Sequence, residues 1–339
     1  MNIKSVCTIA ILVIGLIPVT LAAQTKTSGQ QDTQQALERS TRRAQQRQLY
    51  DLRYQVTAGE QLYWEVEQIA KTKVSMAGFD EESSLRSRSV IRWTIDGVAE
   101  NGDITFTDQL ESAIEWQKVG EAEPVSYDST QDTEVPDIYE GTAERIGKPI
   151  STTTINARGG VIEKEEHIRS AEFGMGRVTP PFPTEPVAIG TQWHIPDELQ
   201  ARHADDSIKT IQTRMLYTLR SVENGIATIS FRREVLTPIE DPKIKSQIQQ
   251  KLNQGSFQFD MNSGRIVRKL VQWNETVQGF EGDDSYLQYV GSYTMKLRTD
   301  EGSTDDSSVN NPLQPAETGD GERSSSRIRP RNGRPVIRK

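Results

Sequence analysis

The stretch GEQLYWEVEQIA, residues 59–70, decides the fold class of this chain. A turn glycine precedes side chains that alternate between apolar and polar, with Leu62, Trp64 and Val66 forming the apolar set. A period of two residues is typical of a strand that buries one face and leaves the other in water. The stretch therefore predicts a half-buried β-strand that starts at a turn.

The same alternation continues through the centre of the chain. It predicts further strands around these apolar sets: Ile91, Trp93 and Ile95; Ile104 and Phe106; residues 211–219; Val267, Val271 and Trp273; residues 287–297. Asn-Gly pairs at 101–102 and 224–225 separate neighbouring runs and favour tight hairpins. We expect a mainly β fold of roughly ten to thirteen antiparallel strands, arranged as meander sheets.

One internal stretch has a helical period instead. Asp241 and Pro242 are typical of an N-cap and a first helical residue, and apolar side chains recur every four residues from 244 to 252. Gly255 stands where a C-terminal cap belongs. We expect one short internal helix here.

A second copy of the opening pattern begins at GTQWHIPDELQA, residues 190–201. Four landmarks follow one another in the same order in both parts of the chain: Gly59, Gly102, Gly141 and Gly160, then Gly190, Gly225, Gly255 and Gly264. The shared order favours an internal duplication over an unrelated β meander, although the spacing between landmarks shrinks. Pro196 is expected to end the second strand early.

These landmarks divide the chain into a first β half at 50–170, a proline-rich connection at 171–189 and a second β half at 190–298. The sequence TPPFPTEP within the connection has too many prolines for a strand or a helix. The pattern is compatible with two related half-barrels, one large curved sheet or a single barrel.

Residues 1–23 have the three-part layout of a secretory signal peptide. MNIK carries one positive charge, residues 6–21 are almost entirely apolar, and two alanines follow. A retained membrane anchor is the alternative, since about 17–25 apolar residues span a bilayer. Pro18 and the alanines favour cleavage, so we expect a periplasmic or extracellular protein with no retained transmembrane segment.

The composition argues against thiol chemistry and against specific nucleic-acid binding. Cys7 is the only cysteine, so a chain that has lost its signal peptide has no disulfide and no thiol nucleophile. The chain holds 40 Lys and Arg against 48 Asp and Glu, and this net charge of −8 argues against specific nucleic-acid binding.

Polar segments flank the β region. Residues 24–49 predict a frayed helix or a disordered spacer, and residues 299–339 predict a disordered tail, acidic to position 322 and basic beyond it. Arginines on a mobile tether can hold an anionic envelope polymer, and the alternative is a solubilising tail. The candidate contacts are Arg327, Arg329, Arg331, Arg334, Arg338 and Lys339.

The outline of signal peptide, G-x-x-L-x-W-x-V strand, P-x-P-x-x-P-V-x-x-G-x-x-W connection and G-x-A-x-I-x-F hairpin resembles a family of exported bacterial proteins. The family is abundant in planctomycetes and is classed as a domain of unknown function. The resemblance covers about residues 52–298. It implies an exported β-rich fold and brings no activity or site residue with it.

Metal-binding residues are few. His194, His203, Asp205 and Asp206 could together hold zinc or calcium, but their spacing matches no metal-binding motif and favours ordinary polar loops. His167 is expected on a charged, solvated strand face. We expect no metal site and no cofactor.

Catalytic motifs are also missing: the chain has no G-x-S-x-G elbow, no Walker loop and no dinucleotide-binding glycine pattern after a strand. Paired carboxylates of the glycosidase kind stay open, because their separation on a β fold cannot be read from spacing. The five tryptophans are expected mainly in the core, with Trp116 and Trp193 the most exposed.

We therefore expect an exported, non-catalytic envelope protein that binds a hydrophobic or amphipathic ligand or acts as a scaffold. The alternatives are a hydrolase that uses paired carboxylates and a surface-attachment module that uses the arginine-rich tail.

Overall fold

A long antiparallel sheet dominates the computed structural model, which describes residues 48–168, 179–203 and 205–298. Its strands are β1 (Gln61–Met76), β2 (Phe79–Val98), β3 (Ile104–Val119), β4 (Val125–Asp128), β5 (Pro149–Ile155), β6 (Val161–Glu166), β7 (Gln192–Arg202), β8 (Ile208–Glu223), β9 (Ile226–Val235), β10 (Gln254–Asp260), β11 (Arg265–Gln278) and β12 (Tyr286–Leu297). The short helices are α2 (Glu140–Ala143) and α3 (Pro242–Ile248), with 3-10 turns η1 (Asp137–Tyr139) and η2 (Gln249–Lys251).

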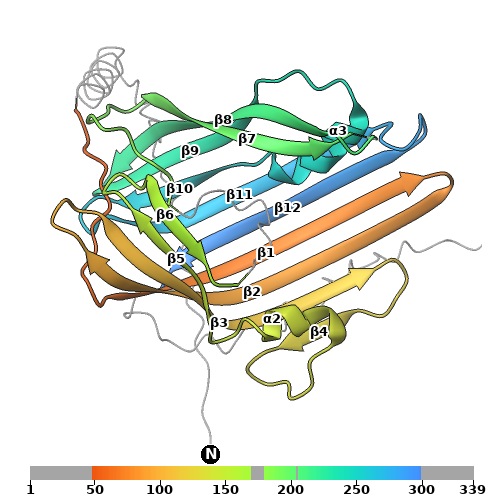
Figure 1. Cartoon of the computed structure of the whole chain (residues 1–339), viewed down its shortest axis with the longest axis horizontal. Helices are drawn as coiled ribbons and strands as arrows, with labels where there is room; N and C mark the ends of the chain where they lie inside the picture. Colours follow the sequence, from red (N-terminus) through yellow and green to blue (C-terminus); the bar gives the residue numbers. More distant parts are fainter. Residues whose placement is uncertain (1–47, 169–178, 204, 299–339) are drawn as a thin grey trace, which may run out of the picture. The chain divides into compact units, whose positions relative to one another are not determined.

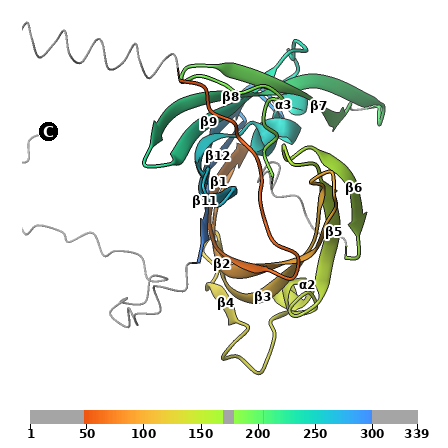
Figure 2. The same ribbon diagram turned by 90° about the vertical axis from the view of Figure 1, so that its left-hand side faces the viewer.

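The twelve strands form one open sheet in the order β6-β5-β3-β2-β1-β12-β11-β10-β9-β8-β7, with β4 beside β3. Each half of the chain is a meander, and the pairing of β1 with β12 joins the halves at the centre (Figure 1). The sheet curls around an interior, and its edges, β6 and β7, are not paired with each other (Figure 2). The predicted mainly β, antiparallel fold is confirmed, in the form of one large curved sheet.

An extended segment that precedes β1 crosses the interior at one end of the sheet (Figure 2). Tyr54 N donates to Ala157 O at 2.9 Å in the β5–β6 hairpin, and Gln55 N donates to Gly264 O at 2.9 Å in the β10–β11 turn. One segment thus ties together turns that belong to the two halves of the sheet.

Arg158 fixes the proline-rich connection to the same place. Its guanidinium donates to Leu52 O at 2.8 Å and to Thr184 O at 2.7 Å, and it pairs with Asp51 at 2.5 Å. Residues 179–189 form no helix or strand apart from a single bridge between Val187 and Tyr50, as the prolines predict.

The two copies of the opening pattern make the same hydrogen bonds. Gly59 N donates to Ile95 O at 2.8 Å, and Gly190 N donates to Leu219 O at 2.8 Å, each linking the start of one strand to the end of the next. Both glycines have positive φ values, 81° and 91°, which residues with a side chain rarely adopt.

Three local expectations are wrong. Pro196 does not end its strand: it lies within β7, an edge strand, where the missing N–H need not serve a second neighbour. Gly255 is not a helix cap but a residue of β10, because η2 ends at Lys251. Gly141, the landmark that matches Gly255 of β10, lies in helix α2 instead of at the start of a strand. The predicted helix itself is present as α3, and Asp241 accepts a hydrogen bond from Lys243 N at 2.8 Å.

The core lies on the inner face of the sheet. Trp64 contacts Trp93, whose ring stacks on Phe106 at 4.4 Å, and Phe182 from the connection packs on Phe259 at 4.7 Å. Helix α3 adds a second cluster, in which Ile244 and Ile248 are fully buried against β7 and β8. Trp116 and Trp193 are half-buried and the other tryptophans buried, as expected.

Within these described ranges, every helix is too short to cross a membrane. The predicted signal peptide at 1–23, most of the lead-in at 24–49, residues 171–178 of the connection and the tail at 299–339 lie outside the described residues, and those expectations stay predictions.

Candidate functional site

A continuous row of inward-facing residues crosses the sheet at mid-height. Strand register places Glu115, Ser87, Gln68, Tyr293 and Val271 directly beside one another from β3 to β11. The row continues through residues on β10, β9, β8 and β7: Gly255, Phe231, Tyr217 and Trp193. Because directly paired residues of antiparallel strands share a face, all of these lie on one surface, the inner band.

The part of the inner band on the second half of the chain is aromatic and tightly packed. Tyr217 contacts Phe231 at 6.2 Å and stacks on Trp193 at 5.6 Å, while Phe257 lies 6.4 Å from both Tyr217 and Phe231. These side chains, Trp193 excepted, are buried. This part of the band is an apolar wall.

The part on the first half is polar and less covered. Leu85, Ser87, Ser89 and Ile91 on β2 face inward but are only half-buried. Ser87 Oγ donates to Glu115 Oε1 at 3.1 Å, and burial raises the pKa of the Glu115 carboxyl above its usual value. This part of the band offers hydroxyls and a carboxyl that holds its proton more readily.

Lys269 lies between the two parts, one step along the sheet from the inner band. It points inward from β11 between Phe257 and Met295, and it is 3% exposed. Burial lowers the pKa of its amine to about 7, and the ammonium lies 5.9 Å from the Phe231 ring. A lysine here is a polar group inside an otherwise apolar region.

Several buried polar atoms have no hydrogen-bond partner among the described residues, and three of them are Trp64 Nε1, Trp273 Nε1 and Gln249 Oε1. Two are indole N–H donors on the inner face and one is an amide oxygen on η2, which contacts β11. Buried polar groups of folded proteins are usually hydrogen-bonded, so donors without partners indicate where a bound molecule or water is accommodated.

Two inward carboxylates of β3, Asp108 and Glu115, lie too far apart to form a catalytic pair of the glycosidase kind. Asp108 and Glu115, both with raised pKa values caused by burial, are seven residues apart on β3, which corresponds to roughly 20 Å along a strand. Glycosidase carboxylates lie roughly 5–10 Å apart. Asp108 accepts a hydrogen bond from Ser151 Oγ, and Asp197 pairs with Arg233 at 2.7 Å, so these acids have structural partners.

The candidate metal ligands are not gathered. His194 and His203 are nine residues apart along β7 and the turn after it, roughly 30 Å for extended chain, and Asp205 accepts hydrogen bonds from Ser207. In the described ranges no three His, Cys, Asp or Glu side chains form a group that could hold a metal ion. His167 Nε2 lies 2.8 Å from Thr152 Oγ1 beside β6, whose six residues are all exposed.

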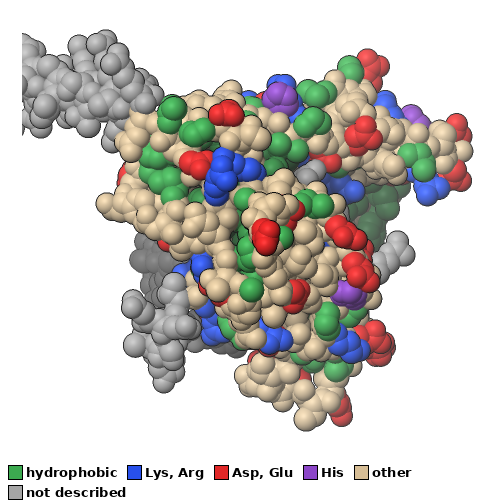
Figure 3. Space-filling model, turned by 60° about the vertical axis from the view of Figure 1, so that its left-hand side comes forward, with side chains coloured by type: hydrophobic (Ala, Val, Ile, Leu, Met, Phe, Trp, Pro, Cys, Tyr) green, Lys and Arg blue, Asp and Glu red, His purple; other side chains and the backbone are tan. Residues whose placement is uncertain are grey.

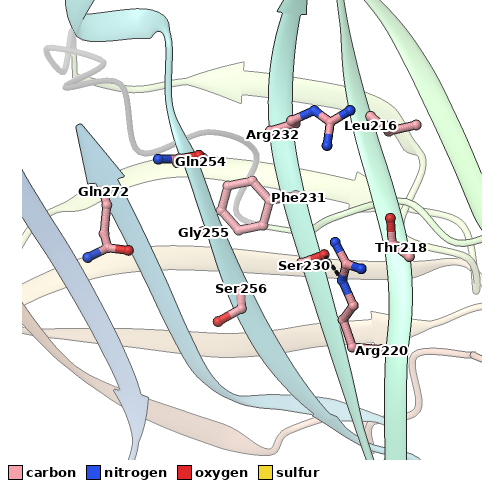
Figure 4. Close-up of a pocket in the computed structure, with 10 residues that line it drawn as sticks. All are labelled: Leu216, Thr218, Arg220, Ser230, Phe231, Arg232, Gln254, Gly255, Ser256 and Gln272. Atoms are coloured by element: carbon pink, nitrogen blue, oxygen red, sulfur yellow. Dashed lines mark hydrogen bonds between the residues drawn. The ribbon is translucent and has the colours of Figure 1, made fainter. Parts of the chain in front are cut away.

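A pocket of about 380 Å³ opens on the outer face of β8–β11 (Figure 4). It is lined by Leu216, Thr218, Arg220, Ser230, Phe231, Arg232, Gln254, Gly255, Ser256 and Gln272. On the face shown in Figure 3, acidic and basic side chains are interspersed. The candidate tail contacts, residues 327–339, lie outside the described residues.

Neither the inner band nor the outer pocket was predicted from sequence. One signal for the band existed: Lys269 lies two positions before Val271, and alternation places both on the buried face. The outer pocket gave no such signal, because its residues come from four strands. The register between these strands cannot be predicted from the sequence of any one of them.

No family model matches this chain, and no curated protein does. A solved structure described as showing lipid–protein interactions in lipovitellin is similar over 72% of this chain, with 10% identity and a TM-score of 0.42. The match spans 26% of that chain, so this protein corresponds to about a quarter of it. A likeness of this size assigns neither a fold family nor an activity.

Proposed function

We propose that this protein is an exported, non-catalytic envelope protein that binds an amphipathic, lipid-like molecule against the inner face of its curved sheet. The observation that carries the proposal is the inner band, which is aromatic on one side and polar and half-covered on the other. The apolar part of a ligand would lie over the half-buried Leu85 and Ile91, and its polar group would lie toward Ser87 and Glu115.

Three features support this reading. The half-buried side chains of β2 leave the first part of the band accessible. The indole N–H groups of Trp64 and Trp273 are hydrogen-bond donors without partners among the described residues. The sheet is also open between β6 and β7. Sites for small apolar molecules are mostly lined by hydrophobic and aromatic side chains with a few polar groups that fix orientation. Export rests on the signal-peptide layout of residues 1–23.

The test is direct binding of a brominated fatty acid to the purified mature protein, followed by quenching of tryptophan fluorescence. We expect saturable quenching with a Kd below roughly 100 μM. Ser87→Trp fills the polar part of the band and is expected to weaken binding at least tenfold. Ser84→Trp is the matched control, because Ser84 pairs with Lys71 on the outer face of the same strand.

Native mass spectrometry of the same protein shows whether a molecule of lipid mass is retained through purification. Equal binding by both tryptophan variants, or quenching that rises linearly without saturation, contradicts the proposal.

A further inference from the structure

The outer pocket differs in chemistry from the rest of the sheet surface. None of its ten lining residues, all within the described part of the chain, is acidic, although the whole chain carries a net charge of −8. Two of the ten are arginines, and five carry a hydroxyl or an amide: Thr218, Ser230, Ser256, Gln254 and Gln272. The pocket therefore combines positive charge with groups that both donate and accept hydrogen bonds.

Arg220 is held in place without being neutralised. Its Nε donates to Ser230 Oγ at 2.6 Å, and in the described ranges no carboxylate forms an ion pair with it. The hydrogen bond uses one of five guanidinium N–H groups, so four remain for a ligand. A guanidinium positioned by its own side-chain partner is suited to bidentate binding of an anionic group.

Positive charge extends beyond Arg220. Glu234 accepts from Arg214 at 2.7 Å and from Arg232 at 2.7 Å, so one carboxylate serves two guanidiniums. With Arg220, this outer part of β8 and β9 has three positive charges against one negative charge. The field at the pocket therefore attracts anions, in a chain whose overall charge repels them.

The shape of the pocket depends on Gly255. A Cβ atom there would lie 1.9 Å from Leu270 O and 2.9 Å from the Phe231 ring, so the backbone of β10 packs closely against its neighbours. Figure 4 shows Gly255 and Phe231 at the centre of the lining, with the arginines on β8 and β9 and the glutamines on β10 and β11. A volume of about 380 Å³ is at the small end of ligand sites, which matches one or two sugar rings.

From these observations we infer that the outer pocket binds an acidic sugar unit of an anionic polysaccharide, with Arg220 on the acidic group and the hydroxyls and amides on the ring hydroxyls. A carboxylated sugar and a sulfated sugar share this chemistry. The pocket opens on the opposite face of the sheet from the inner band, and the two sites share only Phe231 and Gly255.

Calorimetry at 0.05 and 0.15 M salt tests the inference with three oligosaccharides of equal length: an oligogalacturonate, a dextran sulfate and a neutral dextran. We expect at least one acidic oligosaccharide to bind at least tenfold more tightly than the neutral one. The tighter of the two acidic probes identifies the acidic group. Equal binding of all three, or binding of none, overturns the inference.

Two variants separate a built pocket from general surface charge. Arg220→Gln is expected to weaken acidic-sugar binding about tenfold, whereas Arg88→Gln, which removes the same charge from the outer face of β2, is expected to leave it unchanged. Thr218→Val, which deletes the hydroxyl of a residue that is 5% exposed, is expected to reduce affinity several-fold without changing the salt dependence. Equal losses from Arg220→Gln and Arg88→Gln would mean simple charge attraction and would also overturn it.

Discussion

The two halves of the curved sheet use their inner faces differently. On β8–β11, inward side chains such as Leu219, Ile229, Phe257 and Val271 are at most 1% exposed. On β2 and β3, inward positions hold serines, Glu115 and Gln117, and most of these are half-buried. The second half therefore forms a continuous apolar wall, whereas the first half combines a buried cluster at Trp64, Trp93 and Phe106 with a half-buried stretch on β2 and β3, the polar wall.

This difference indicates that the residues that stabilise the fold and the residues available to bind a ligand lie in different parts of the sheet. Burying apolar surface is the dominant favourable contribution to folding, so the apolar wall is expected to contribute more to stability than the polar wall. Half-covered polar positions contribute little to stability and stay available for a ligand. Four predictions test this division, and the proposed ligand site fails with it if the two halves behave alike.

The largest effect is expected from a truncation in the apolar wall. Phe257→Ala removes a ring that is 1% exposed and touches three other aromatic side chains, so the free energy of unfolding should fall by about 3–5 kcal/mol. Leu85→Ala, at a half-buried inward position of β2, should cost about 1 kcal/mol. Urea unfolding followed by circular dichroism measures both. Equal losses would show that the halves contribute alike.

The next effect concerns the amine inside the apolar wall. Burial lowers the pKa of Lys269 to about 7, whereas the unfolded chain titrates near the ordinary value of 10.5. Between these values the unfolded state binds more protons, so stability rises with pH from about 7 upward, by at most about 1.4 kcal/mol per pH unit. Lys269→Met should abolish this rise.

Denaturant unfolding of both proteins at pH 7, 8, 9 and 10 gives the slopes. Lys296→Met, on the outer face of the neighbouring strand, is the control and should keep the wild-type slope. A wild-type slope that survives in Lys269→Met would place the titrating group elsewhere and remove the argument that this lysine is buried within the wall.

A third prediction concerns what holds the two halves together. Gly264 has a φ of 63°, and a Cβ atom there would lie 2.4 Å from Gln55 Cβ, so Gly264→Ala should cost about 2–3 kcal/mol. Gly159, with a φ of 81°, meets Tyr54 at 2.4 Å and should respond similarly. Gly97→Ala is the control, because nothing lies within 4 Å of its Cβ position. Thermal unfolding compares the three. A large loss of stability from only one of the two substitutions, Gly159→Ala or Gly264→Ala, would mean that the segment preceding β1 is held by one half alone.

Alternation within single strands was enough to predict which side chains face inward. Leu62, Trp64 and Val66 are buried, as their spacing indicates, and the same rule would have placed Lys269 inside had it been applied through that position. Local sequence fixes these directions because successive side chains of a strand point to opposite faces.

Pairing between distant strands could not be predicted in the same way. β1 pairs with β12 across more than 200 residues of sequence, and the sequence of neither strand identifies its partner. The expectations for Pro196 and Gly255 fail for the same reason: a proline is tolerated only because β7 is an edge strand, and the glycine is required because another backbone approaches it. The inner band and the outer pocket depend on such pairings.

The smallest effect is expected in the polar wall and has the opposite pH sign from that of Lys269. Burial raises the pKa of Glu115, so the folded state holds this proton to a higher pH than the unfolded state does. Stability is therefore lost as pH rises above the ordinary value of 4.5, and the loss is complete above the raised pKa. Glu115→Gln keeps the oxygen that accepts from Ser87 and removes the charge, so it should raise the stability at pH 7 and leave it unchanged at pH 4. Glu111→Gln, which removes an acid paired with Arg92 on the outer face of β3, should lose stability at pH 7 instead. If Glu115→Gln also loses stability at pH 7, this carboxylate is stabilised as an anion, and the polar wall is a structural ion-pair network instead of a surface left open for a ligand.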